Sequence, residues 1–343
     1  MYFRILFFNY LKNFLIIISG LIAFFVFIDY MMNFNKLSDS INLEILYLFY
    51  NSLNASLLIY FLTLLFAAIF TIINLVKNNE MVAFLSMGYS PKKLLFPIIT
   101  GAFFVTFVFI FIQSISSVSF KDRAKSILSG KYFTSNVDKD LFFKYQNKVI
   151  YIKKLDSVKK IAYNIKLFVI KDGKVSNIYE IAEAKFKDNQ WISNRIVKFS
   201  IEDNYFRKDI VHLSLLKGFK PDILNKLESR KAMTLKIALQ ALYLFKRGDI
   251  DLNFIKTYIY NALIPPISFI LLIFLSVLKA PIHPRISNIS LYIFVWVFSS
   301  ILLWGVFLLA QKISAAGIVS PESVFITPFL LLLGLTVYYF RKI

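Results

Sequence analysis

Six stretches of the sequence are apolar and carry no charged residue, and together with their flanks each is long enough to cross a lipid bilayer. A helix needs ~20 residues to cross the hydrocarbon core, which is ~30 Å thick. The stretches are residues 13–28, 45–76, 94–120, 257–278, 286–311 and 323–340. We expect the first to run from Tyr10 past Asp29 as an uncleaved anchor, and the second to begin near Ala55. With 58% hydrophobic residues, the sequence predicts an α-helical membrane protein with six transmembrane helices.

The loops between these stretches differ in charge, which predicts the side of the membrane on which each lies. One set holds nine basic residues against the single acid Glu80: Arg4, Lys12, Lys77, Lys92, Lys93, Lys279, Arg285, Arg341 and Lys342. The other set holds two basic residues against four acids: Lys36 and Lys312, with Asp29, Asp39, Glu44 and Glu322. Because cytoplasmic loops are enriched in Lys and Arg, we expect the first set and both termini in the cytoplasm.

Residues 121–256 form a long polar insert between the third and fourth stretches, on the opposite side from the termini. The insert holds 29 Lys and Arg against 15 Asp and Glu, a net +14 of the chain's +20. Because these basic residues are scattered, we interpret them as a solvated surface and expect no nucleic-acid partner. Its strand-like segments are 148–154, 163–170, 178–187, 195–202 and 209–216, with a hairpin signal at 171–174. They predict an antiparallel β sandwich or jelly roll.

Helical segments flank the predicted strands. Residues 120–130 look like a helical extension of the third span, and residues 233–248 place apolar side chains on one broad helical face before Gly248. We therefore expect three domains: residues 1–120 with spans one to three, residues 121–252 with the β jelly roll and its flanking helices, and residues 253–343 with spans four to six.

The sequence contains no recognisable catalytic or metal-binding motif. His212 and His283 lie far apart without a partner at metal-ligand spacing, and there is no cysteine. A P-loop, a G-x-S-x-G elbow and an H-E-x-x-H helix are all missing. We therefore expect a non-catalytic chain with no metal or cofactor of its own. Carboxylates are almost absent from the spans, and we interpret Asp29 as a boundary residue, which disfavours an ion-coupled transporter.

The segment "NNEMVAFLSMGYSPKKLLFP" (78–97) predicts a short ordered helix, near 79–88, between the second and third spans. An Asn at 78 or 79 is a candidate N-cap, and Glu80 lies in the first turn. Gly88 is placed to end the helix, and Ser90 with Pro91 to begin the next one.

This helix could lie on the lipid surface or insert into a groove of a soluble partner. Its short length and its acidic residue favour the partner. The residues expected to carry the docking, including the apolar face at helical spacing, are Glu80, Met81, Val82, Phe84, Leu85, Gly88 and Ser90.

The same segment resembles the S-E-L-x-x-x-x-x-x-G-x-S segment of the LptF/LptG permeases, membrane subunits of the ABC transporter that exports lipopolysaccharide. Glu80, Gly88 and Ser90 hold the matching places, whereas Asn79 replaces the usual serine. Residues 315–335 also resemble the family's last periplasmic turn and final span. The segments "FIDY" (27–30) and "KYQNKVIYIKKL" (144–155) look more like the LptG member.

The resemblance covers the whole chain and implies a multi-pass protein of the bacterial inner membrane, with residues 121–252 in the periplasm. It implies a paralogous LptF-like or LptG-like permease as partner, and an LptB-like ATPase dimer that binds ATP and Mg²⁺ and docks on the short helix. Lipopolysaccharide would be extracted from the inner membrane and passed to LptC-like and LptA-like periplasmic proteins. Basic residues near the outer bilayer surface are candidate contacts for its phosphates: Lys36, Lys121, Arg123, Lys125 and Lys312.

Two other functions remain open from the sequence. A membrane-anchored structural or sensory protein could bind a partner through the β insert and use the short helix only for signalling. A secondary transporter would need buried charges that the spans lack.

Overall fold

A computed structural model of the protein describes residues 2–37, 40–115, 120–130, 137–145, 148–156, 159–171, 174–187, 190–193, 196–202, 205–211, 214–215, 235–245, 252–283 and 288–342. The chain divides into two compact units. The first comprises Met1–Leu128 with Thr257–Ile343, and the second comprises Ser129–Lys256. The domain limits drawn from the sequence, at residues 121 and 252, stay a prediction.

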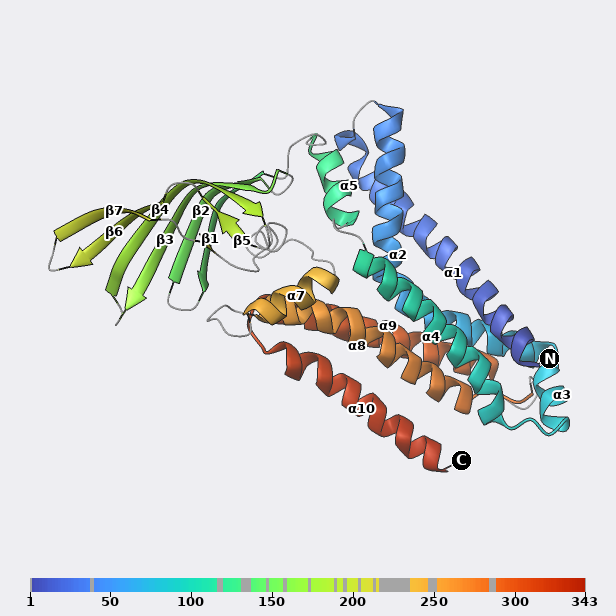
Figure 1. Ribbon diagram of the computed structural model, residues 1–343. Helices are drawn as coiled ribbons and strands as arrows, with labels where there is room; N and C mark the ends of the chain where they lie inside the picture. The colour runs from blue at the N-terminus through green and yellow to red at the C-terminus, as the bar shows by residue number, and fades with distance from the viewer. Residues whose placement is uncertain are drawn as a thin grey trace. The chain divides into compact units, whose positions relative to one another are not determined.

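The helices follow one another along the chain as shown in Figure 1. They are α1 (Tyr2–Asn33), the 3-10 turn η1 (Phe34–Lys36), α2 (Ile41–Lys77), α3 (Glu80–Ser86), α4 (Pro91–Ile115), α5 (Phe120–Leu128), α7 (Leu235–Phe245), α8 (Asn253–Leu278), α9 (Ile289–Ala315) and α10 (Pro321–Lys342). Within the described ranges, six helices are long and apolar enough to cross a membrane: α1, α2, α4, α8, α9 and α10. The six predicted spans are thereby confirmed.

Helix α2 is longer than a membrane crossing requires. Its 37 residues rise 1.5 Å each, about 55 Å in total, against ~30 Å of hydrocarbon. The part from Ala55 to Lys77 is enough for the crossing, so the turns that begin at Ile41 extend beyond the hydrocarbon. These outer turns contact α1 and α5 and carry several of the polar contacts described below.

Polar contacts inside the bundle hold α1 against α2. The hydroxyl of Tyr10 donates to the carbonyl oxygen of Leu64 at 3.1 Å, and Asn13 Nδ2 donates to Thr71 Oγ1 at 2.8 Å. Buried polar groups need such partners because hydrocarbon offers none. Gly101 of α4 completes this contact, since a Cβ built on it would lie 2.5 Å from the Tyr10 ring.

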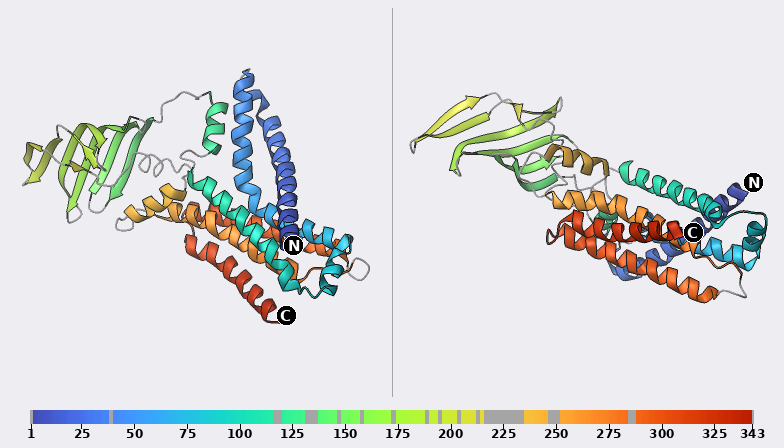
Figure 2. Two further views of the ribbon diagram at one scale, coloured as in Figure 1. Left: turned by 45° about the vertical axis from the view of Figure 1, so that its right-hand side comes forward. Right: turned by 90° about the horizontal axis from the view of Figure 1, so that it is seen from below.

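The last three spans pack through aromatic side chains. The Phe325 ring of α10 lies 6.1 Å from that of Phe307 on α9 and 6.2 Å from that of Tyr260 on α8, measured between centroids. The hydroxyl of Tyr292 on α9 donates to the carbonyl oxygen of Ser276 on α8 at 3.2 Å. Figure 2 shows α8, α9 and α10 running alongside one another.

The second unit contains an antiparallel sheet. Its strands are β1 (Val137–Tyr145), β2 (Lys148–Asp156), β3 (Ile161–Lys171), β4 (Lys174–Lys187), β5 (Gln190–Ile192), β6 (Ile196–Glu202), β7 (Tyr205–Val211) and β8 (Ser214–Leu215). Within the described residues the order is β1-β2-β3-β4-β5-β8, and β6 pairs with both β4 and β7. Alternate apolar residues are buried along the sheet, among them Ile150, Ile152, Ile165, Ile181 and Ile196.

Four of the five predicted strands are confirmed as β2, β3, β4 and β6, and the fifth segment contains the end of β7 and β8. The hairpin at 171–174 is also confirmed, since Lys171 pairs with Lys174. Strands β1 and β5 were missed, because the charged start of β1 and the three residues of β5 carry no strand pattern of their own. An antiparallel sheet between the third and fourth spans is shown, while its jelly-roll topology stays a prediction.

The predicted helices beside the strands are confirmed in part. Residues 120–128 form helix α5, which packs against α2 within the first unit. Residues 235–245 form α7, whereas Gly248, the predicted stop, lies outside the described residues.

Candidate functional site

Helix α3 lies at the same end of the helical unit as the N-terminus (Figures 1 and 2). Its N-cap is Asn79, which is one of the two residues predicted for this position. The Asn79 side chain does not make the capping hydrogen bond. Asn79 has a left-handed backbone, φ 59°, because it also follows the C-cap of α2, Asn78. Asn tolerates this conformation better than most residues. Asn78 Nδ2 lies 3.4 Å from Glu80 Oε1, so the corner is set by backbone geometry with a weak side-chain contact.

The end of α3 is closed by a Schellman motif at the predicted position. Gly88 has φ +83°, and its N–H donates to the carbonyl oxygen of Leu85 at 3.0 Å. The N–H of Tyr89 donates to the carbonyl oxygen of Phe84 at 3.1 Å, and the two rings pack edge to face, 6.0 Å apart. This pair of hydrogen bonds and the accompanying apolar contact define the motif.

Helix α4 begins where the sequence predicts. Pro91 is its first residue, where a missing N–H costs nothing. The carbonyl oxygen of Ser90 accepts from the N–H of Lys93 at 2.9 Å, and the Ser90 hydroxyl lies 3.4 Å from the same nitrogen. Both ends of the corner between α3 and α4 are therefore fixed by hydrogen bonds.

The apolar residues of α3 face the bundle more than the outside. Met81 is 6% exposed and belongs to the main core, while Phe84 and Leu85 are half-buried against it. Of the predicted apolar contact face, only Val82 is exposed. A helix of seven residues has room for one apolar stripe, and positions 81, 84 and 85 use it for packing within the chain. The outer surface of α3 instead consists of Val82, Ala83, Ser86 and Met87, with Glu80 half-exposed beside them.

An aromatic contact ties this corner to the first span. The ring of Tyr89 lies 4.4 Å from the ring of Tyr2, at the start of α1. Neither tyrosine was singled out in the sequence, because the contact joins residues that are far apart in the chain. A displacement of α3 would therefore be carried to α1 as well as to α2 and α4.

At the other end of α1, Asp29 joins the first two helices. Its Oδ2 accepts hydrogen bonds from the hydroxyl of Tyr47 and from Asn51 Nδ2, the latter at 2.8 Å. Asn33 Nδ2 donates to the backbone oxygen of Asp29 at 3.0 Å. Tyr47 and Asn51 are buried on α2. The only signal for them in the sequence is that these two polar side chains lie four positions apart within an apolar stretch.

Among the described residues, Arg123 is the predicted phosphate ligand that has a protein partner. Its Nη1 donates to the Tyr50 hydroxyl at 2.8 Å, and its guanidinium carbon lies 5.2 Å from the centre of the Tyr50 ring. Ala124 and Ile127 of α5 pack with Tyr47 in a small core. Arg123 therefore holds α5 against the outer turns of α2.

The other predicted cations are exposed. Lys121 and Lys125 lie one turn apart on α5, and Lys36 ends η1 beside Leu37, which packs on the same small core as α5. Four of the five predicted residues thus surround the junction of η1, α2 and α5. Lys312 lies in the last turn of a different helix, α9.

Metal chemistry finds no support in this part of the chain. Within the described ranges, no three His, Asp or Glu side chains are grouped so as to hold a metal ion. His212 lies outside those ranges.

The sequence profile of the family described as "Lipopolysaccharide export system permease LptF/LptG" matches residues 4–342. Comparison with individual curated proteins gave no match. The family match takes in every described helix and strand apart from the first two residues of α1. It does not distinguish LptF from LptG, so the likeness to LptG stays a prediction. The chain therefore belongs to the LptF/LptG family of lipopolysaccharide export permeases.

Proposed function

We propose that this chain is a permease subunit moved by a separate ATPase that docks on the outer surface of α3. The LptF/LptG family is the permease component of the lipopolysaccharide export system, and its members are non-catalytic transmembrane subunits. The chain is accordingly a multi-pass protein of the inner membrane. ATP and Mg²⁺ would be bound by the partner, an LptB-like dimer, and not by this chain.

The observation that carries the proposal is the rigid setting of α3. Its C-terminal end is closed by the Gly88 cap, and the corner that follows is held by the contact between Tyr89 and Tyr2. A helix that is fixed in this way transmits a push to the spans, whereas a frayed helix would absorb it. Val82 and Met87 remain exposed, at 37% and 67%, with Glu80 beside them, which suits insertion into a partner's groove.

The substrate end of the proposal rests on the cations at the other end of α2. Lipopolysaccharide carries phosphates, and Arg and Lys bind phosphate through charge-assisted hydrogen bonds. Lys36, Lys121 and Lys125 are exposed around the junction at which Arg123 contacts Tyr50. Lys312 would contribute from α9. A paralogous permease would complete the path, and LptC-like and LptA-like proteins would receive the lipid in the periplasm.

The docking proposal is tested by placing a charge on the outer surface of α3. Val82→Asp should weaken binding of the ATPase by about tenfold or more, because an unpaired charge in an interface is poorly tolerated. ATPase-coupled release of lipopolysaccharide from proteoliposomes should fall in parallel. Glu80→Lys and Gly88→Val should have the same effect, by charge reversal and by loss of the cap.

Val175→Asp is the matched control, since Val175 is 38% exposed and lies on β4. It should leave both binding of the ATPase and transport unchanged. Unaltered ATPase binding and transport in the Val82→Asp protein would refute docking on α3.

A further inference from the structure

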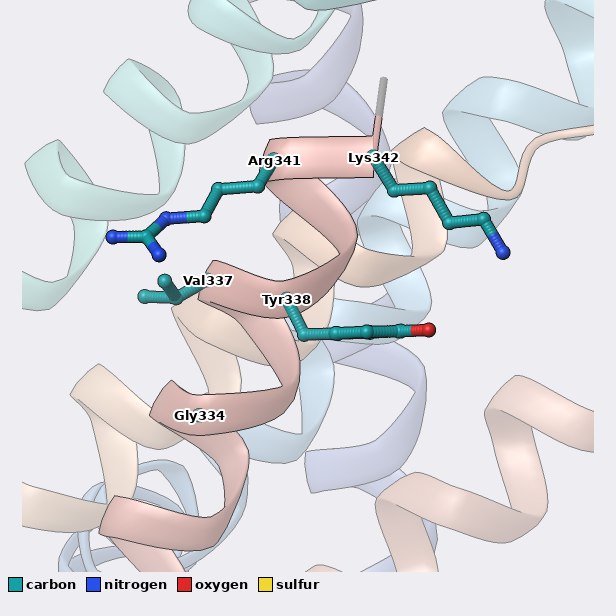
Figure 3. A pocket seen from close by; sticks show the side chains of 5 residues that line it. All are labelled: Gly334, Val337, Tyr338, Arg341 and Lys342. Atoms are coloured by element: carbon teal, nitrogen blue, oxygen red, sulfur yellow. The ribbon is translucent and has the colours of Figure 1, made fainter.

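The last two turns of α10 form a shallow groove that the transport proposal does not use. Its volume is about 410 Å³, and it opens broadly to the outside (Figure 3). The lining residues are Gly334, Val337, Tyr338, Arg341 and Lys342.

The spacing of these residues creates the groove. Positions 334, 337, 338, 341 and 342 follow the i, i+3, i+4, i+7, i+8 pattern and share one face of a helix. Gly334 leaves the middle of this face without a side chain, and a Cβ built there would meet no atom within 4 Å. The groove therefore has an open apolar floor at Gly334 and Val337.

The opposite face of the same turns lies toward the C-terminal end of α8 and Lys279, the residue that follows it. The ring of Phe340 lies 5.6 Å from that of Phe274, and Lys279 Nζ lies 4.4 Å from the centre of the Tyr339 ring. Tyr339 and Phe340 thus face α8, which directs the groove away from it. The groove therefore lies on the exposed side of α10, where Val337 and Tyr338 are 43% and 59% exposed.

Two cations stand at the end of the groove. Within the described residues Arg341 and Lys342 form no ion pair, and the one acid of α10, Glu322, lies in its first turn. Figure 3 shows Arg341 extending to the side of Val337 and Lys342 to the side of Tyr338, whose hydroxyl points the same way. A negatively charged group would therefore meet the guanidinium on the side of Val337, and the ammonium and the phenol on the side of Tyr338.

We propose that this groove binds an anionic phospholipid, with an acyl chain along Gly334 and Val337 and the headgroup phosphate at Arg341, while Lys342 adds positive charge on the side of Tyr338. The two parts of such a lipid match the two parts of the groove. An apolar floor without cations would accept the tail of any lipid. Cations without an apolar floor would extend to the membrane interface without holding a particular lipid. The combination selects lipids that carry both features and net negative charge.

The test is native mass spectrometry of the purified permease complex, with phosphatidylglycerol or phosphatidylethanolamine as the added lipid. Removing both charges in R341Q/K342Q should lower retention of phosphatidylglycerol by about 30-fold, since each cation near a lipid surface contributes roughly fivefold. Retention of phosphatidylethanolamine, which carries the phosphate but no net charge, should fall by much less. Gly334→Leu, which fills the floor, should also reduce phosphatidylglycerol retention, whereas Gly334→Ala should preserve it.

Two controls separate a site from general attraction. Lys12→Gln removes one exposed cation from α1, and Gly305→Leu adds a side chain where no atom lies within 4 Å. Both should retain phosphatidylglycerol like the parent protein. If the charge variant loses the lipid while Gly334→Leu keeps it, the cations attract lipid without a groove and the proposal is overturned. Equal retention in all variants would overturn it as well.

Discussion

At Gly101 the absence of a side chain is a packing requirement of the helical unit. A Cβ at this position would come within 2.5 Å of the ring of Tyr10, which is fully buried and hydrogen-bonded to Leu64. Gly101→Ala should therefore destabilise the protein by about 1–3 kcal/mol, the usual cost of overpacking a core. Thermal unfolding in detergent measures this as a lower midpoint.

The reason for that loss can be checked in a second background. In a Tyr10→Ala protein the clash is gone, so the added Gly101→Ala change should cost little, and the two effects should not add. Gly305→Ala is the control, because nothing lies within 4 Å of a Cβ there. Additive losses would mean that Gly101 acts through something other than the Tyr10 ring.

Residues whose hydrogen bonds are to neighbours in the sequence could be predicted. Residues whose partners are far away in the sequence could not. Gly88, Ser90 and Pro91 were placed from the sequence because caps depend on local hydrogen bonds. The contact between Arg123 and Tyr50 joins positions 73 residues apart, and no local pattern encodes it.

At the level of elements, the apolar spacing in α3 predicts a helix with an apolar stripe but not what that stripe packs against. The spacing of Met81, Phe84 and Leu85 correctly predicts an apolar stripe on a short helix. It does not reveal whether the stripe packs within the chain or on a partner. The structure assigns it to the chain, which moves the expected docking surface to the neighbouring Val82 and Met87.

Helix α5 is held to α2 through Tyr50 in two ways that can be separated. Tyr50→Phe removes the hydrogen bond to Arg123 and keeps the ring beneath the guanidinium, a loss of about 1 kcal/mol. Tyr50→Ala removes the cation–π contact and the ring's packing too, which should cost about 1 kcal/mol more. Hydrogen exchange of the α5 amides should therefore accelerate about fivefold in the first variant and more in the second.

A matched change on the same helix serves as the control for α5. Ile45 lies on the same helix α2 and is 60% exposed, so Ile45→Ala should leave exchange in α5 unchanged. If Tyr50→Ala also leaves it unchanged, α5 is held by its small apolar core with Tyr47 alone.

For the whole molecule, the bilayer made the helical part easier to predict than the sheet. All six spans were found because the thickness of the hydrocarbon sets their length. Strands β1 and β5 were missed because their own residues do not favour a strand. These segments are extended because β1 pairs with β2, and β5 pairs with β4 and β8. The side of the membrane on which each unit lies follows from charge alone and stays a prediction.

That orientation can be measured directly, since the chain contains no cysteine and every introduced thiol is unique. Lys77 ends α2 near α3, and Lys153 lies on β2; both are exposed. In spheroplasts with an intact inner membrane, an impermeant maleimide should label Lys153→Cys and spare Lys77→Cys. Lysis should then expose Lys77→Cys, because the charge distribution places this end in the cytoplasm. Labelling of Lys77→Cys before lysis would reverse the topology and would separate α3 from any cytoplasmic ATPase.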